Sequence, residues 1–144
     1  MIVVSADADY RWALPAGAYA ARTGTPILFV TKVSVPAQTA TALQRRGARA
    51  RLFVLGPAEA VPPNIVDQLA QFGDVRRIEA GDPFENAVRF AEFRDEAADF
   101  GWGHTGRGAR KRAVANTILV NPERWQERDR GGALARGGRS GPYS

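Results

Sequence analysis

Two carboxylates follow the first apolar run of the chain at a spacing that suits metal chemistry. Asp7 and Asp9 stand in Asp7-Ala8-Asp9, just after the run at residues 2–4. Paired carboxylates at the end of a strand can hold a divalent cation against the phosphates of a sugar nucleotide. In the other interpretation, one aspartate caps a helix beginning near Tyr10 and the second is solvated. Metal chemistry and a helix cap are therefore the two hypotheses for this pair.

Other catalytic or cofactor-binding patterns are absent or out of place. The chain has no cysteine, and its single histidine, His104, has no charged neighbour at a fixed spacing. Residues 101–106 satisfy Gly-x-Gly-x-x-Gly, but they follow a predicted helix end at residues 95–100 instead of the first strand. Neither a phosphate-binding loop nor a Gly-x-Ser-x-Gly motif occurs. We therefore expect no cofactor and no catalytic activity.

Short apolar runs recur along the first 95 residues. The runs at residues 2–4, 27–30 and 52–55 are uninterrupted. Such runs indicate strands that are buried on both faces, as in a parallel sheet. A weaker strand is predicted at residues 75–78.

The segments between these runs have the periodicity and punctuation of helices. Pro36 and Gly47 mark the start and the end of one of them. In the last predicted helix one apolar stripe is formed by Phe84, Ala87, Val88 and Ala91. The alternation predicts an α/β fold, a Rossmann-like open parallel sheet of about four strands with helices on both faces. Ligands of such sheets bind outside the carboxyl ends of the strands.

The net charge of +5 is concentrated in the last third of the chain. Residues 1–100 contain 11 basic and 12 acidic residues, whereas residues 101–144 contain 9 and 3. We therefore predict a folded domain at residues 1–97 and an irregular basic tail at residues 98–144, with one extra strand near residues 117–121. No apolar run approaches the roughly 18 residues of a membrane span. The first residues also lack the basic and apolar regions of a signal peptide.

Three stretches, with the alanine-rich segment after the first, carry a family resemblance. They are Val3-Val4-Ser5-Ala6-Asp7, Gly24-Thr25-Pro26-Ile27-Leu28-Phe29-Val30-Thr31 and Leu52-Phe53-Val54-Leu55-Gly56. In order and spacing they resemble one repeat of the cell wall-binding repeat 2 family, a surface-anchoring module of exported proteins. The chain departs from the family pattern at Gly56-Pro57 and in Gly81-Asp82-Pro83-Phe84-Glu85-Asn86-Ala87, which lacks the family's arginine and tyrosine. Residues 117–125 loosely resemble the start of a truncated second repeat.

The resemblance implies a non-catalytic module that binds an anionic cell-wall polymer at the cell surface. Binding would need cations near the strand-end loops, and the candidates in the folded part are Arg11, Lys32 and Arg77. Repeats of this family occur in tandem, so the resemblance also implies a homo-oligomer or further repeats that bind together.

Two alternatives to wall binding stay open. One is binding of nucleic acid or another polyanion through the tail, which would be nonspecific and steeply salt-dependent. Its cations would be Arg107, Arg110, Lys111, Arg112, Arg128, Arg130, Arg136 and Arg139. The other alternative is a sugar-nucleotide-binding α/β enzyme that uses Asp7 and Asp9, whose binding would depend on a divalent metal.

Overall fold

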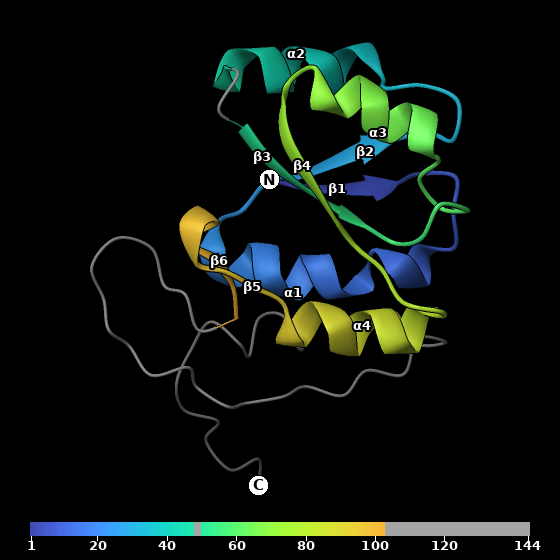
Figure 1. The fold of residues 1–144 in the computed structure, drawn as a ribbon, viewed down its shortest axis with the longest axis vertical. Helices are drawn as coiled ribbons and strands as arrows, with labels where there is room; N and C mark the ends of the chain where they lie inside the picture. Colours follow the sequence, from blue (N-terminus) through green and yellow to red (C-terminus); the bar gives the residue numbers. More distant parts are fainter. Residues whose placement is uncertain (48–49, 103–144) are drawn as a thin grey trace, which may run out of the picture.

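A computed structural model describes residues 1–47 and 50–102 of the chain (Figure 1). The predicted tail strand near residues 117–121, His104 and the basic residues from 107 onward lie outside the described residues. In the described part, no helix is long and apolar enough to cross a membrane.

The predicted α/β fold is confirmed: four parallel strands form one sheet with helices on both faces. The strand order is β2-β1-β3-β4. The strands are β1 (Ile2–Ser5), β2 (Ile27–Val30), β3 (Ala50–Leu55) and β4 (Gly73–Ile78). In the register, Ile2 of β1 pairs with Ile27 on one side and with Phe53 on the other. The central strands β1 and β3 are thus the buried apolar runs that the sequence predicts.

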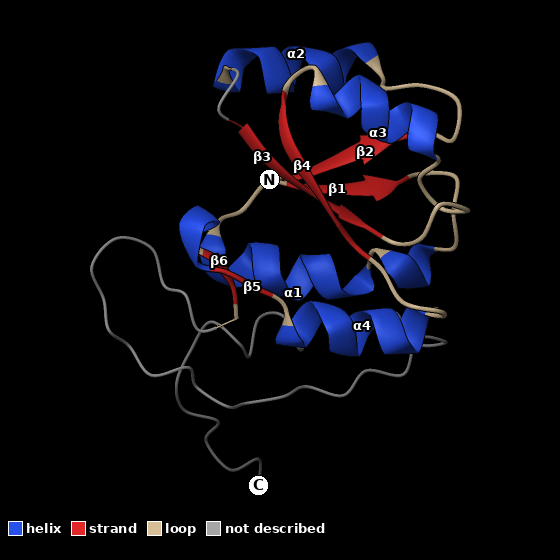
Figure 2. Cartoon of the chain, viewed as in Figure 1, coloured by secondary structure: helices blue, strands red, loops and turns tan. Residues whose placement is uncertain are grey.

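Each face of the sheet is covered by two helices. These are α1 (Leu14–Thr23), α2 (Ala37–Arg46), α3 (Pro63–Ala70) and α4 (Pro83–Glu92), and a short 3-10 helix, η1 (Tyr10–Trp12), precedes α1. Figure 2 shows α1 and α4 on one face and α2 and α3 on the other. Pro36 and Gly47 flank α2, as predicted, and Gly47 has the positive φ of 74° that glycine adopts without strain. The result is a three-layer α/β sandwich.

Side-chain alternation along the strands divides the core in two. In β1, Ile2 and Val4 face α1 and α4, whereas Val3 faces α2 and α3. In the same way, Phe53 of β3 joins the first cluster and Leu52 the second. Because both faces of each central strand are buried, the strands need continuous apolar sequence.

The chain after α4 differs from the prediction. The predicted helix end at residues 95–100 is wrong, because Phe93 takes an extended conformation with φ −62° and ψ 134° and ends the helix. An antiparallel pair follows, β5 (Arg94–Asp95) and β6 (Phe100–Gly101), joined through the 3-10 helix η2 (Glu96–Ala98). Phe100 is only 4% exposed, so this hairpin belongs to the hydrophobic core.

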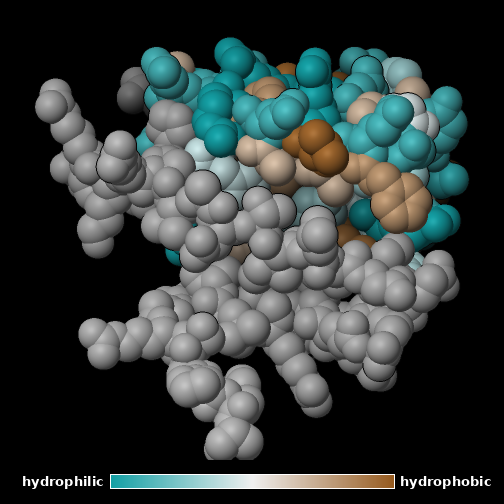
Figure 3. Space-filling view, turned by 90° about the horizontal axis from the view of Figure 1, so that it is seen from below, coloured by the Kyte–Doolittle hydropathy of each residue, from teal (hydrophilic) through white to brown (hydrophobic). Residues whose placement is uncertain are grey.

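Helix α4 is also rotated relative to the predicted stripe. It buries Asn86 and Phe90, whereas Phe84 and Val88 are 60% and 59% exposed. The apolar stripe is thus not the buried face of α4, and Phe90 is buried instead, with its ring centroid 5.6 and 6.1 Å from those of Tyr19 and Phe100. Figure 3 shows that apolar side chains are open to solvent on the face of the molecule where α1 and α4 lie.

Candidate binding site at the carboxyl ends of the strands

The loops that follow the four strands lie along one edge of the sheet, where parallel sheets bind their ligands. Asp7 and Asp9 follow β1, Lys32 follows β2, and Arg77 stands near the end of β4. The structure therefore brings the residues predicted from the sequence to the same edge. Their contacts assign them different roles.

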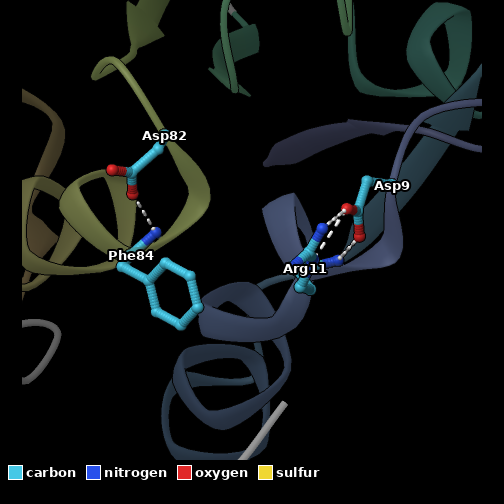
Figure 4. Close-up of polar contacts among 4 residues, drawn as sticks. All are labelled: Asp9, Arg11, Asp82 and Phe84. Atoms are coloured by element: carbon cyan, nitrogen blue, oxygen red, sulfur yellow. Dashed lines mark hydrogen bonds and ion pairs between the residues drawn. The ribbon is translucent and has the colours of Figure 1, made fainter. Parts of the chain in front are cut away.

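Asp9 and Arg11 form a closed pair on η1. Asp9 caps this 3-10 helix, since its Oδ1 accepts a hydrogen bond from the Arg11 backbone N–H at 2.9 Å. Its Oδ2 accepts a second bond from Arg11 Nε at 2.7 Å, and Arg11 Nη2 forms an ion pair with the same oxygen (Figure 4). These bonds from Arg11, the side-chain bond above all, lower the pKa of the Asp9 carboxyl. The Arg11 side chain is 36% exposed, but the Asp9 carboxylate offsets its positive charge.

Asp7 connects the first two loops of the edge. Its Oδ2 accepts a hydrogen bond from the backbone N–H of Lys32 at 3.0 Å. The loop that carries Lys32 is closed by a hydrogen bond from the backbone N–H of Ser34 to Oγ1 of Thr31, at 2.9 Å. The two aspartates therefore have separate hydrogen-bond partners. Of the two hypotheses for this pair, the helix cap describes the role of Asp9. No group of three or more metal-ligating side chains occurs in residues 1–47 and 50–102.

Lys32 is the open cation of this edge. The residue is exposed, and no carboxylate of the described chain lies within ion-pair distance of its amine. Its backbone is held beside the loop that follows β1, because its N–H donates to Asp7 Oδ2.

Arg77 binds the chain itself. Its Nη1 and Nη2 donate to the carbonyl oxygens of Gly56 and Val61, each at 2.7 Å. Its Nε lies 3.7 Å from Glu79 Oε2, and the side chain is 19% exposed. The guanidinium group therefore spans the loop between β3 and α3 and holds both of its ends.

Trp12 packs over the residue that follows β3, next to the point between β1 and β3 where strand order reverses and α/β sheets commonly bind ligands. Gly56 has a φ of 105°, and a Cβ there would lie 3.1 Å from the Ala60 Cβ and 3.7 Å from the ring of Trp12. Trp12 and Ala60 thus pack directly over the Gly56 backbone.

Two exposed aromatic residues, one on η1 and one on α4, were not among the predicted site residues. Tyr10 is 49% exposed and, with Ala8, Asp9 and Arg11, lines a shallow open hollow. Phe84, in the first turn of α4, is 60% exposed, and its ring points toward η1 (Figure 4). The sequence carried one signal for Phe84, its membership of the apolar stripe of the last predicted helix.

The fold and the site define a class: a three-layer α/β module with a 2-1-3-4 parallel sheet and a polar strand-end edge. Among solved structures it is similar to Cwp6 from Clostridium difficile, with a TM-score of 0.55 and 22% identity, over 61% of this chain and 14% of that chain. It is also similar to Cwp8 from Clostridium difficile, with a TM-score of 0.57 and 23% identity, over 64% of this chain and 16% of that chain. The match thus spans about a seventh of the Cwp6 chain and about a sixth of the Cwp8 chain. No family model and no curated protein matches the sequence.

Proposed function

We propose that this chain is a non-catalytic module that attaches to an anionic cell-wall polymer at the cell surface. The observation that carries the proposal is the fold shared with Cwp6 and Cwp8, which are cell wall proteins. The likeness covers most of the described α/β domain and a small part of either relative. The likeness therefore concerns one part of Cwp6 and of Cwp8, and not those whole proteins.

The charges of the strand-end edge support a local contact with an anion. Lys32 supplies an exposed ammonium group, and Arg11 adds a guanidinium group whose charge Asp9 offsets. In this proposal Arg77 contributes by holding the loop between β3 and α3 in place. The edge binds through few charges, so a single module has modest affinity.

Self-association would raise that affinity through multivalency. Two modules that bind one polymer chain convert the second contact into an intramolecular event. Two apolar side chains that a second copy could contact are Phe29 and Val33, which are 54% and 79% exposed at and after β2, an edge strand of the described sheet. We expect the chain to sediment as an oligomer at the concentrations at which it binds polymer, and Phe29→Glu to shift it toward monomer.

The first test is retention of the full chain on an immobilised, purified anionic cell-wall glycopolymer over a salt series. Lys32→Gln should weaken retention about 3-fold, since a surface charge contributes up to about 1 kcal/mol. Arg45→Gln removes the same charge from an exposed position near the end of α2, and retention should not change. Equal losses of retention in Lys32→Gln and Arg45→Gln would mean that only the net charge of the chain affects binding to the polymer.

Two additions to the same experiment separate the alternatives. Duplex DNA as competitor should leave retention unchanged, whereas displacement at low salt would favour a polyanion-binding tail. A chelator should also have no effect, because the proposal uses no metal. Loss of binding on chelation would favour the enzyme hypothesis that uses Asp7 and Asp9.

A further inference from the structure

Two exposed rings flank the polar edge from two different helices. Tyr10 opens η1, which follows β1, and Phe84 stands in the first turn of α4, which follows β4. The helices η1 and α4 contact one another, and the ring of Phe84 points toward the turn that carries Arg11 (Figure 4). The two aromatic residues thus stand on neighbouring helices, although β3 separates β1 from β4 in the sheet.

The backbone under both rings is fixed. Asp82 Oδ1 accepts hydrogen bonds from the N–H groups of Phe84 and Glu85, at 2.7 and 2.9 Å, so the first turn of α4 is capped. On the other side, Asp9 caps η1 next to Tyr10. Because this surface is already ordered, a ligand that binds to it meets a smaller entropic cost.

Charged hydrogen-bonding groups lie beside the rings. Tyr10 lines an open hollow together with Ala8, Asp9 and Arg11. About a third of the side-chain surface of Asp9 and of Arg11 is exposed, so their charged groups are available to a ligand that contacts Tyr10. An apolar partner, such as the apolar face of a protein helix, would displace the water around this charged pair and offer no hydrogen bonds in its place. That desolvation would cost free energy. The ligand must therefore offer both C–H faces for the rings and hydroxyl groups for the charges.

Sugar rings have this combination. A pyranose carries a face of C–H groups that can stack on an aromatic ring, and a rim of hydroxyl groups that donate to carboxylates and accept from guanidinium groups. We propose that Tyr10 and Phe84 form a stacking surface for saccharide units of the bound polymer, with the Asp9–Arg11 pair bonding their hydroxyl groups. The inference rests on the proposed function and adds that the sugars of the polymer, and not its charges alone, are recognised.

The test compares two probes that share one backbone. Poly(glycerol phosphate) without sugars and the same polymer carrying hexosyl substituents are titrated into the full chain by calorimetry. The wild-type chain should bind the hexosylated polymer about 5-fold more tightly, since an aromatic contact contributes on the order of a 10-fold factor at most. A neutral hexose oligosaccharide should compete with this increment and not with binding of the bare polymer.

Variants assign the increment to the rings. Tyr10→Leu and Phe84→Leu keep an apolar side chain, and each should bring the hexosylated polymer close to the affinity of the bare one. Val88→Ala is the matched control, because Val88 lies one turn further along α4 with the same exposure, and it should retain the preference. Tyr10→Phe keeps the ring and should retain it as well.

The outcomes separate this inference from the proposed function. Equal wild-type affinity for the two polymers, or the same loss in Val88→Ala as in Phe84→Leu, would overturn the stacking surface and leave polymer attachment standing. Failure of the wild-type chain to bind either polymer would contradict the proposed function itself and the inference with it.

Discussion

The ring of Phe100 lies flat on the ring of Phe53, with centroids 3.7 Å apart and 13° between the planes. Phe53 stands in the central strand β3, and Phe100 in the hairpin that follows α4. Phe93 meets both rings edge-on, at 5.8 and 6.0 Å. Residues 93–101 therefore cover a part of the sheet face that α1 and α4 leave open.

The hairpin is also held by polar contacts. Asp95, 2% exposed at its side chain, lies 3.2 Å from Arg76 Nη1 and 3.7 Å from Arg51 Nη1. Gly101 donates its N–H to the buried hydroxyl oxygen of Tyr19 at 3.0 Å. The hairpin, which spans the predicted boundary at residues 97 and 98, is thus tied to β3, β4 and α1.

Phe100→Ala should destabilise the fold by about 3 kcal/mol, in the range for loss of a buried aromatic side chain. Urea unfolding followed by tryptophan fluorescence measures the difference. The control is Phe84→Ala, which removes the same ring from an exposed position and should cost less than about 0.5 kcal/mol. A cost below about 1 kcal/mol for Phe100→Ala would show that the stack is dispensable.

Tyr19 makes the fold sensitive to alkali. Burial raises the pKa of its hydroxyl above the usual value of 10.0, against an opposing contribution from the Gly101 N–H. Because the folded pKa is the higher one, Tyr19 contributes stability that is fully present below the unfolded pKa and is lost as the pH rises through the folded pKa. We expect the free energy of unfolding to fall as the pH rises above about 10.

Tyr19→Phe should remove this contribution to the alkaline loss. At neutral pH it should cost about 1 kcal/mol, since the buried Gly101 N–H loses its acceptor. Denaturation curves at neutral and alkaline pH measure both effects. An unchanged alkaline slope in Tyr19→Phe would assign the sensitivity to other groups.

The strands were predictable from the sequence because each central strand is buried on both faces and must be apolar throughout. The runs at residues 2–4 and 52–55 gave β1 and β3 within a few residues. The edge strand β4 was also found, although Arg76 and Arg77 interrupt it, because Val75 and Ile78 remain apolar. Local composition was sufficient wherever burial is set by the sheet itself.

The rotation of α4 and the hairpin were not predictable by the same reasoning. Phe90 and Phe100 are buried through contacts with Tyr19, which is distant in sequence, and no local pattern distinguishes them from the exposed Phe84. The same limit applies at the site. Sequence reasoning placed Asp7, Asp9 and Lys32 at one edge, but the partner of each carboxylate depends on how the loops meet.

Arg77→Lys tests whether Arg77 acts on the loop. Lysine keeps the charge but lacks the planar fork that bonds the Gly56 and Val61 carbonyl oxygens together. We expect a loss of about 1–2 kcal/mol in the free energy of unfolding and faster hydrogen exchange in the loop between β3 and α3. Arg22→Lys, at an exposed position of α1, is the control and should change neither. Unchanged stability with weaker polymer retention would instead make Arg77 a ligand contact.

Asp9→Asn tests whether Asp9 limits the charge that Arg11 offers to an anionic polymer. Asparagine can keep the cap of η1 through its side-chain oxygen, but it no longer neutralises the guanidinium group. Retention on the polymer should rise about 2-fold to 4-fold at low salt, as expected for a surface ion pair, and less at high salt. Asp67→Asn makes the same change of net charge at an exposed position of α3, and a matching rise there would reduce the effect to net charge.

The pH dependence gives an independent reading of the same pair. Because its bonds to Arg11 lower the pKa of Asp9, its carboxylate stays ionised to a greater extent at about pH 4 than that of an ordinary aspartate, which is about half protonated there. The stability that the pair contributes is present above the unfolded pKa and is lost only as the pH falls through the lower folded pKa. Retention of the wild-type chain should therefore gain little from protonation of Asp9 between about pH 8 and about pH 4, so the advantage of Asp9→Asn should be nearly constant over that range. An advantage that falls to about half near pH 4 would mean that Asp9 titrates in its ordinary range and that the pair with Arg11 does not persist in solution.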